Sequence, residues 1–81
     1  MDDIEKINRT IDQFAEVMKE KMKEKYYEGY EGWDDIAGLE DHITHRLIEH
    51  AKRGKGQEVD MANFAMMLWN SSRNSTSTER R

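Results

Sequence analysis

The chain has 81 residues, no cysteine and a net charge of −4, and hydrophobic and charged residues make up 36% and 37% of the sequence. This length predicts one small domain with a modest core, and the lack of cysteine excludes disulfides and thiolate metal sites. No apolar run approaches the roughly 18–20 residues that cross a bilayer, and the acidic, amphipathic N-terminus is unlike a secretory or transit peptide. We therefore expect a soluble cytoplasmic protein without a membrane partner.

Charge is spread unevenly along the chain. Residues 28–41 carry six acidic residues and no lysine or arginine, whereas residues 46–55 carry four lysine or arginine residues against one glutamate. A protein that binds duplex nucleic acid typically has a basic face on a basic domain. Direct binding of nucleic acid is therefore not expected.

A long first helix is predicted from about Asp3 to Tyr27. Large apolar residues recur there at steps of three and four and form one continuous stripe: Ile4, Ile7, Ile11, Phe14, Met18, Met22 and Tyr26. Asp2 and Glu5 have the spacing of a capping box, which favours a helix start at this point. Because the helix is long for so small a protein, part of its stripe could pack against a second copy of the chain in a homodimer.

The next segment, residues 26–35 (YYEGYEGWDD), crowds four aromatic residues around two glycines and predicts a loop. One interpretation is that the aromatic rings fold back over the core. The other is an exposed acidic–aromatic surface that binds a partner protein with a basic surface, since aromatic anchors ringed by charge are typical of interfaces. The candidate partner-binding residues are Tyr27, Tyr30, Glu31, Trp33, Asp34 and Asp35.

A second helix is predicted from residue 36 or 39 to residue 53, with Asp34 or Asp35 as its N-cap. Its core face repeats at steps of four: Leu39, Ile43, Leu47 and Ala51. Gly54 is well placed to end the helix in a left-handed conformation. The short connection at residues 54–57 predicts that this helix and the next form an antiparallel αα-hairpin.

Residues 58–70 (EVDMANFAMMLWN) are apolar at almost every position, which predicts a helix that is buried on most of its circumference and central to the domain. Residues 71–81 have no apolar side chain and predict a disordered tail. The expected fold is all-α, with a single domain at residues 1–70 that has a long N-terminal helix and a C-terminal αα-hairpin.

Two polar residues, Asp60 and Asn63, interrupt the third helix on one side. Together with Glu49 they could form a Mg²⁺ site, because Mg²⁺ prefers oxygen ligands. The alternative is structural: Asp60 interacts with the helix dipole, and Asn63 hydrogen-bonds across the helix pair or to Arg46.

The three histidines all lie in the predicted second helix. His42 and His45 share one side of it with Glu49, which is a weak pattern for a transition-metal site, and the alternative is that they are surface side chains. His50 lies nearer the apolar arc and is expected to be a hydrogen-bonded residue at the edge of the core. The sequence contains no paired nucleophile and histidine, no phosphate-binding glycine loop and no dinucleotide motif.

The segments RLIEHAKRGKG and VDMANFAMMLWN are similar to the last two helices of phage-encoded MazG-like proteins. That family comprises all-α nucleotide pyrophosphohydrolases, which hydrolyse nucleoside triphosphates to monophosphates with Mg²⁺ held by four acids in an ExxE and an ExxD motif. The resemblance covers residues 46–70. It implies that Glu49 corresponds to the first Glu of ExxE and Asp60 to the Asp of ExxD, with catalytic and metal-binding roles.

Two positions depart from the family's pattern. Gln57 stands where ExxD has its Glu, Lys52 stands where ExxE has its second Glu, and the motifs are closer together than in the family. Loss of two carboxylates and gain of a cation would weaken Mg²⁺ binding and phosphoryl transfer. The sequence therefore favours a small phage-type protein without a cofactor, which binds another protein in the host cytoplasm and inhibits or modulates a host nucleic-acid-handling protein. The alternative is a divergent Mg²⁺-dependent pyrophosphohydrolase with Glu49 and Asp60 as catalytic residues.

Overall fold

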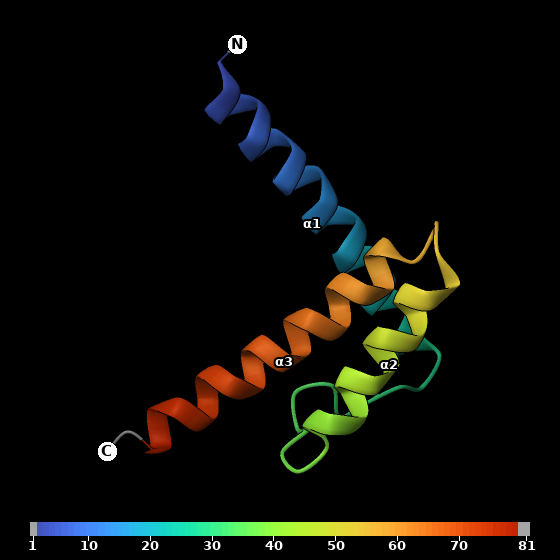
Figure 1. Cartoon of the computed structure of the whole chain (residues 1–81), viewed down its shortest axis with the longest axis vertical. Coiled ribbons are helices and arrows are strands. Elements are labelled where there is room, and N and C mark those ends of the chain that lie inside the picture. Colours follow the sequence, from blue (N-terminus) through green and yellow to red (C-terminus); the bar gives the residue numbers. More distant parts are fainter. Residues whose placement is uncertain (1, 80–81) are drawn as a thin grey trace.

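Three helices make up the structure, a computed structural model that describes the backbone of residues 2–79 and the side chains of residues 2–73 (Figure 1). They are α1 (Asp3–Tyr27), α2 (Glu40–Arg53) and α3 (Glu58–Glu79), and the described residues contain no strand. α3 packs against both α1 and α2, and it forms the αα-hairpin with α2. The predicted all-α fold, with a long first helix and a C-terminal hairpin, is confirmed. No helix in the described part of the chain is long and apolar enough to cross a membrane.

α1 begins where the sequence predicts, because side chains cap its first turn. The Asp2 carboxylate accepts a hydrogen bond from the Glu5 N–H at 2.8 Å, and the Glu5 carboxylate accepts one from the Asp2 N–H at 3.1 Å. This capping box satisfies N–H groups that no carbonyl within the helix can reach. The helix ends at Tyr27, and Gly29 follows with a φ of 100°, so the predicted loop starts there.

α2 begins at Glu40, and the prediction that Asp34 or Asp35 caps it is wrong. The N-cap is Leu39, whose side chain makes no capping hydrogen bond. Ile36 is buried, and the chain makes a further turn around it in which the Leu39 N–H donates to the Ile36 carbonyl at 2.7 Å. Burying this side chain removes apolar surface from water, and it delays the helix start beyond the two acidic residues.

The hairpin turn after α2 depends on Gly54. Its N–H donates to the Ala51 carbonyl at 3.2 Å, and its φ of 93° lies in the region that favours glycine. The chain reverses between Arg53 and Glu58, which confirms Gly54 as the end of the second helix.

Gly54→Ala is expected to destabilise the fold by about 1–2 kcal/mol, because a β-carbon disfavours positive φ even where no atom crowds it. Urea denaturation followed by circular dichroism would measure the loss. Lys55→Ala, at the next position of the same turn, is the matched control and should stay within about 0.5 kcal/mol of the wild type. Equal losses in the two variants would contradict the role given to the glycine backbone.

The core of a single chain is small. Ile36 and Ile43 are the buried hydrophobic side chains among the described residues, and His50 and Asn63 are the buried polar ones. Most α3 side chains up to residue 71 are half-buried, whereas the sequence predicts burial on most of the circumference. The difference arises because α1 and α2 cover only part of α3 within one chain. Apolar surface therefore stays open beside the central helix.

α3 continues past Asn70, the last residue of the predicted domain, and ends at Glu79. It differs there from the disordered tail predicted for residues 71–81, of which residues 80 and 81 lie outside the described part. The stretch contains no Pro or Gly that would stop a helix. Ser71 Oγ donates to Glu40 Oε2 at 3.1 Å, and the Arg73 guanidinium lies 4.4 Å from the centre of the Trp69 ring. The Ser71 bond ties the first turn after residue 70 to the start of α2, whereas the contact between Arg73 and Trp69 lies within α3.

The Glu40 carboxylate at the start of α2 accepts hydrogen bonds from several groups. Its own backbone N–H, the Ser71 hydroxyl and the Gly38 N–H hold the pKa of Glu40 below its ordinary value, although partial desolvation acts in the opposite direction. The stabilisation from these bonds is therefore fully present above the ordinary glutamate pKa. It is lost as the pH falls through the lowered pKa of the folded state.

Ser71→Ala is expected to raise the pKa of Glu40 toward its ordinary value, because the variant removes the hydroxyl that donates to the carboxylate. A carboxyl-carbon NMR titration would measure the change. Ser72→Ala, at an exposed neighbouring position, is the control and should leave the Glu40 titration unchanged. An unchanged pKa in Ser71→Ala would show that the contact between α3 and α2 does not persist in solution.

Candidate functional site

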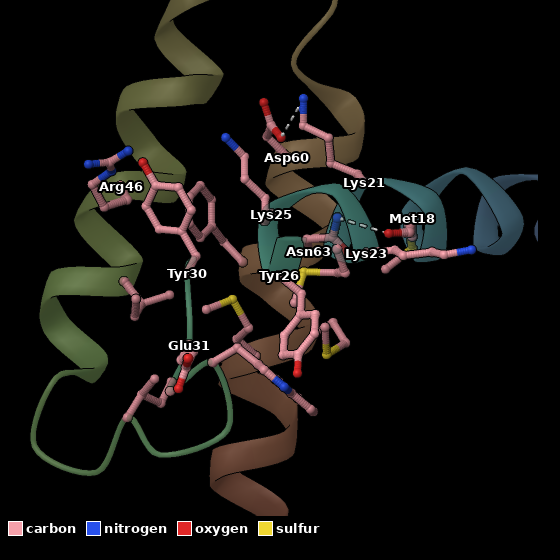
Figure 2. A pocket seen from close by; sticks show the side chains of 18 of the residues that line it. Met18, Lys21, Lys23, Lys25, Tyr26, Tyr30, Glu31, Arg46, Asp60 and Asn63 are labelled. Atoms are coloured by element: carbon pink, nitrogen blue, oxygen red, sulfur yellow. Dashed lines mark hydrogen bonds and ion pairs between the residues drawn. The ribbon is translucent and has the colours of Figure 1, made fainter. Parts of the chain in front are cut away.

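An open groove runs between the second half of α1, the loop that follows it, α2 and α3 (Figure 2). Its volume is about 910 Å³, and most of its walls are apolar. Four methionines line it, together with five aromatic and three aliphatic side chains: Met18, Met22, Met66, Met67, Tyr26, Tyr27, Tyr30, Trp33, Phe64, Ile36, Leu39 and Ile43. Methionine side chains are flexible and polarisable, so a groove of this composition can adapt to differently shaped apolar ligands.

Basic side chains from α1 and α2 line part of the groove. They outnumber the acidic ones that line it, and comprise Lys19, Lys21, Lys23, Lys25 and Arg46 against Glu31 and Asp60. Lys25 Nζ lies 5.2 Å from the centre of the Tyr30 ring, and the Arg46 guanidinium lies 5.9 Å from the centre of the Phe64 ring. Figure 2 shows Lys25 and Arg46 on the same side of the groove as Tyr30. The groove therefore combines an apolar floor with a positively charged rim.

The structure divides the predicted acidic–aromatic surface into two parts. Tyr27, Tyr30, Glu31 and Trp33 line the groove, whereas Asp34 and Asp35 are exposed and do not line it. Tyr27 is 75% exposed and Tyr30 is 65% exposed, so these rings do not fold over the core. Their exposure is what a recognition surface requires.

The polar side of α3 faces α1. Asp60 Oδ1 lies 3.8 Å from Lys21 Nζ, and Asp60 Oδ2 lies 3.8 Å from His50 Nδ1. Asn63 is buried and its Nδ2 donates to the Met18 carbonyl at 3.4 Å. Its partner therefore lies on α1, whereas the sequence predicted a partner across the helix pair or at Arg46. The packing of α1 against α3 brings that carbonyl beside Asn63 (Figure 2).

His50 is buried at the edge of the core and hydrogen-bonded, as the sequence predicts. Its Nδ1 lies 2.7 Å from Gln57 Oε1, and its ring centre lies 5.2 Å from that of Phe64. Gln57 occupies a position where the resemblance expects an acid. In this chain the amide joins the end of α2 to the start of α3.

The candidate metal ligands are engaged with cations and histidines. Glu49 Oε2 lies 3.5 Å from His45 Nε2, and Asp60 lies beside Lys21 and His50. Within residues 2–73, whose side chains the structure describes, there is no group of three or more His, Asp or Glu side chains arranged to hold a metal ion. The arrangement of Asp60 fits its predicted structural role in the first turn of α3.

No protein-family model, curated protein or solved structure matches the chain with significance. The MazG-like resemblance and the phage origin therefore stay predictions based on residues 46–70.

Sequence reasoning missed the basic rim and assigned Met18 and Met22 only to the apolar stripe of the first helix. Lys21 and Lys25 follow Met18 at steps of three and seven residues, so the helical period could have placed them beside the apolar stripe. Arg46 gave no such signal, because its place at the rim depends on how α2 packs against α3. Glu and Lys residues are mixed along residues 16–25, and this mixture conceals a face of the helix that is mainly basic.

Proposed function

We propose that the chain is a protein-binding module whose groove takes the apolar face of an amphipathic helix with acidic flanks. The observation that carries this proposal is the apolar groove of methionines and exposed tyrosines inside a rim of lysine and arginine. Helix-in-groove recognition needs an apolar channel for the side chains that recur along one face of the ligand helix. Tyrosine and methionine supply contact area that adapts to the ligand, and tyrosine is enriched among residues that dominate binding.

The charge of the rim selects the partner. Acidic residues that flank the apolar face of a ligand helix would meet Lys21, Lys25 and Arg46. A partner with a basic surface, which the acidic loop suggests, would meet Asp34 and Asp35 outside the groove and would place its cations against the basic rim. We therefore favour an acidic partner for the groove.

A pair of designed peptides tests the proposal. Both form amphipathic helices with the same isoleucine stripe, but one has glutamate flanks and the other has lysine flanks. The fluorescence of Trp33, which lines the groove, would follow each titration. The glutamate-flanked peptide is expected to bind roughly tenfold more tightly or better, with an affinity that falls as salt is added. Equal binding of both peptides, or binding of neither by a monomeric form of the chain, would contradict the proposal.

The second candidate is a divergent Mg²⁺-dependent nucleotide pyrophosphohydrolase. It is favoured by the cations of the rim, because Lys21, Lys25 and Arg46 could hold phosphates while Tyr30 stacks on a base. It is disfavoured by Asp60, which faces Lys21 and His50. Release of pyrophosphate from a panel of deoxynucleoside triphosphates with Mg²⁺ or Mn²⁺ would decide between the candidates. We expect no turnover. If the chain releases pyrophosphate and Asp60→Ala abolishes that release, the pyrophosphohydrolase becomes the favoured candidate.

A further inference from the structure

The first half of α1 presents an apolar face that nothing in a single chain covers. Every described side chain from residue 2 to residue 14 is exposed, and this part of the helix projects away from α2 and α3 (Figure 1). Ile7 is 52% exposed and Ile11 is 59% exposed, and both belong to the apolar stripe. A capping box fixes the start of this half, so it is a formed helix with an unpartnered face.

We infer that the occupant of the groove is the first half of α1 from a second copy of the chain. The two copies exchange these halves, so that each α1 lies antiparallel to the other and each groove receives Ile4, Ile7, Ile11 and Phe14 of its partner. This inference rests on the proposed function, in which the groove takes an amphipathic helix with acidic flanks. It names that helix.

The charges along α1 favour an antiparallel pair. The first half is mainly acidic, with Asp2, Asp3, Glu5, Asp12 and Glu16 against Lys6 and Arg9. The second half is mainly basic, with Lys19, Lys21, Lys23 and Lys25 against Glu20 and Glu24. The basic residues of the second half also form most of the groove's rim. An antiparallel pair places opposite charges together, whereas a parallel pair would place like charges together.

The spacing of the stripe fixes the register. The stripe runs from Ile4 to Tyr26, and its midpoint is Ala15, which lies at the edge of the groove. A two-fold axis at Ala15 places the isoleucines of one copy against the methionines and Tyr26 of the other, and the same contact is made twice. Asp12 and Lys19 lie two helical turns apart on the same flank of the stripe, one on each side of the axis. Asp12 of one copy therefore approaches Lys19 of the other copy.

A second copy also supplies the burial that one chain lacks. Ile36 and Ile43 alone form the buried apolar core of the described residues, and the methionines of the groove are half-buried. Small domains of this kind gain stability when association removes further apolar surface from water. The exchange covers the exposed stripe and the open groove in one step.

Sedimentation velocity of the full chain tests the inference. The wild type is expected to be a dimer, and Ile7→Glu combined with Ile11→Glu should be a monomer that keeps its helical circular dichroism, because both side chains are exposed within one chain. Arg9→Gln combined with Gln13→Glu is the matched control. It changes the net charge by the same amount on the opposite face of α1 and should stay dimeric. A monomeric wild type, or a dimeric Ile7→Glu, Ile11→Glu variant, would overturn the inference.

A charge exchange tests the orientation. Asp12→Lys should weaken the dimer at least about tenfold at low salt, and Asp12→Lys combined with Lys19→Asp should restore it. Failure of the second change to restore the dimer would overturn the antiparallel arrangement. If the wild type is monomeric but binds the glutamate-flanked peptide, the inference fails and the proposed function stands. If it neither dimerises nor binds that peptide, both fail.

Discussion

Met66→Asp is expected to lower the affinity of the groove for a glutamate-flanked amphipathic helix by about 10- to 100-fold. Met66 lines the groove from α3, so a carboxylate at this position would lie under the apolar face of the ligand and lose its hydration on binding. It would also repel the acidic flanks that the lysine rim attracts. The measurement is a fluorescence titration in the Ile7→Glu, Ile11→Glu background, in which the helix of a second copy does not compete for the groove.

Met61→Asp is the matched control for that change. Met61 is also a half-buried residue of α3, but it does not line the groove. The variant carries the same new charge on the same helix and should bind the peptide as tightly as its background does. If the two variants lose affinity equally, the effect comes from the stability of α3 and the groove is not the binding site.

Ile43→Ala is expected to destabilise the chain by about 2–4 kcal/mol, a large part of the stability of so small a domain. Ile43 on α2 is 9% exposed and is one of the two buried hydrophobic side chains in the described part of the chain, so little else can replace its contacts. Urea denaturation would show the loss as a lower midpoint with an unchanged slope. Truncation also enlarges the groove that Ile43 lines.

Ile48→Ala provides the comparison on the same helix. Ile48 is 45% exposed, so removing the same atoms should cost less than about 1 kcal/mol. A similar cost at both positions would mean that another surface covers Ile48 in solution and that the single-chain core is not the one described.

The features that sequence reasoning placed correctly are local. The capping box of Asp2 and Glu5 and the seven-residue apolar stripe depend on neighbours along α1, and both boundaries of that helix were predicted. Gly54 likewise ended α2 where its backbone freedom suggested. In these cases the chain needs no distant contact to select the local conformation.

The features that sequence reasoning missed depend on distant contacts. Asp34 and Asp35 are good caps by residue type, but burial of Ile36 moves the start of α2 to Glu40. Asn63 bonds to the Met18 carbonyl, which lies 45 positions away along the chain. Such pairings follow from the packing of whole helices, and periodicity within one helix does not reveal them.

The groove was predicted only in part. The exposed aromatic residues were proposed as a recognition surface, and Tyr27, Tyr30, Glu31 and Trp33 do lie together. The sign of the surrounding charge was not foreseen, because the acidic loop dominates the sequence around those residues while lysines from α1 and an arginine from α2 form the rim. Charge composition along the chain therefore pointed to a basic partner, whereas the acidic partner that we propose rests on the arrangement of these charges in space.

The central claim is that the groove binds an apolar helix, and the methionine methyl groups report on it directly. Met18, Met22, Met66 and Met67 line the groove, whereas Met61 does not. The Ile7→Glu, Ile11→Glu variant, with its methionine methyl groups labelled, would be titrated with the glutamate-flanked peptide and followed by NMR. We expect the four groove methyl signals to shift together while the Met61 signal stays in place. Unshifted groove signals, or a shift of Met61 alone, would contradict the account.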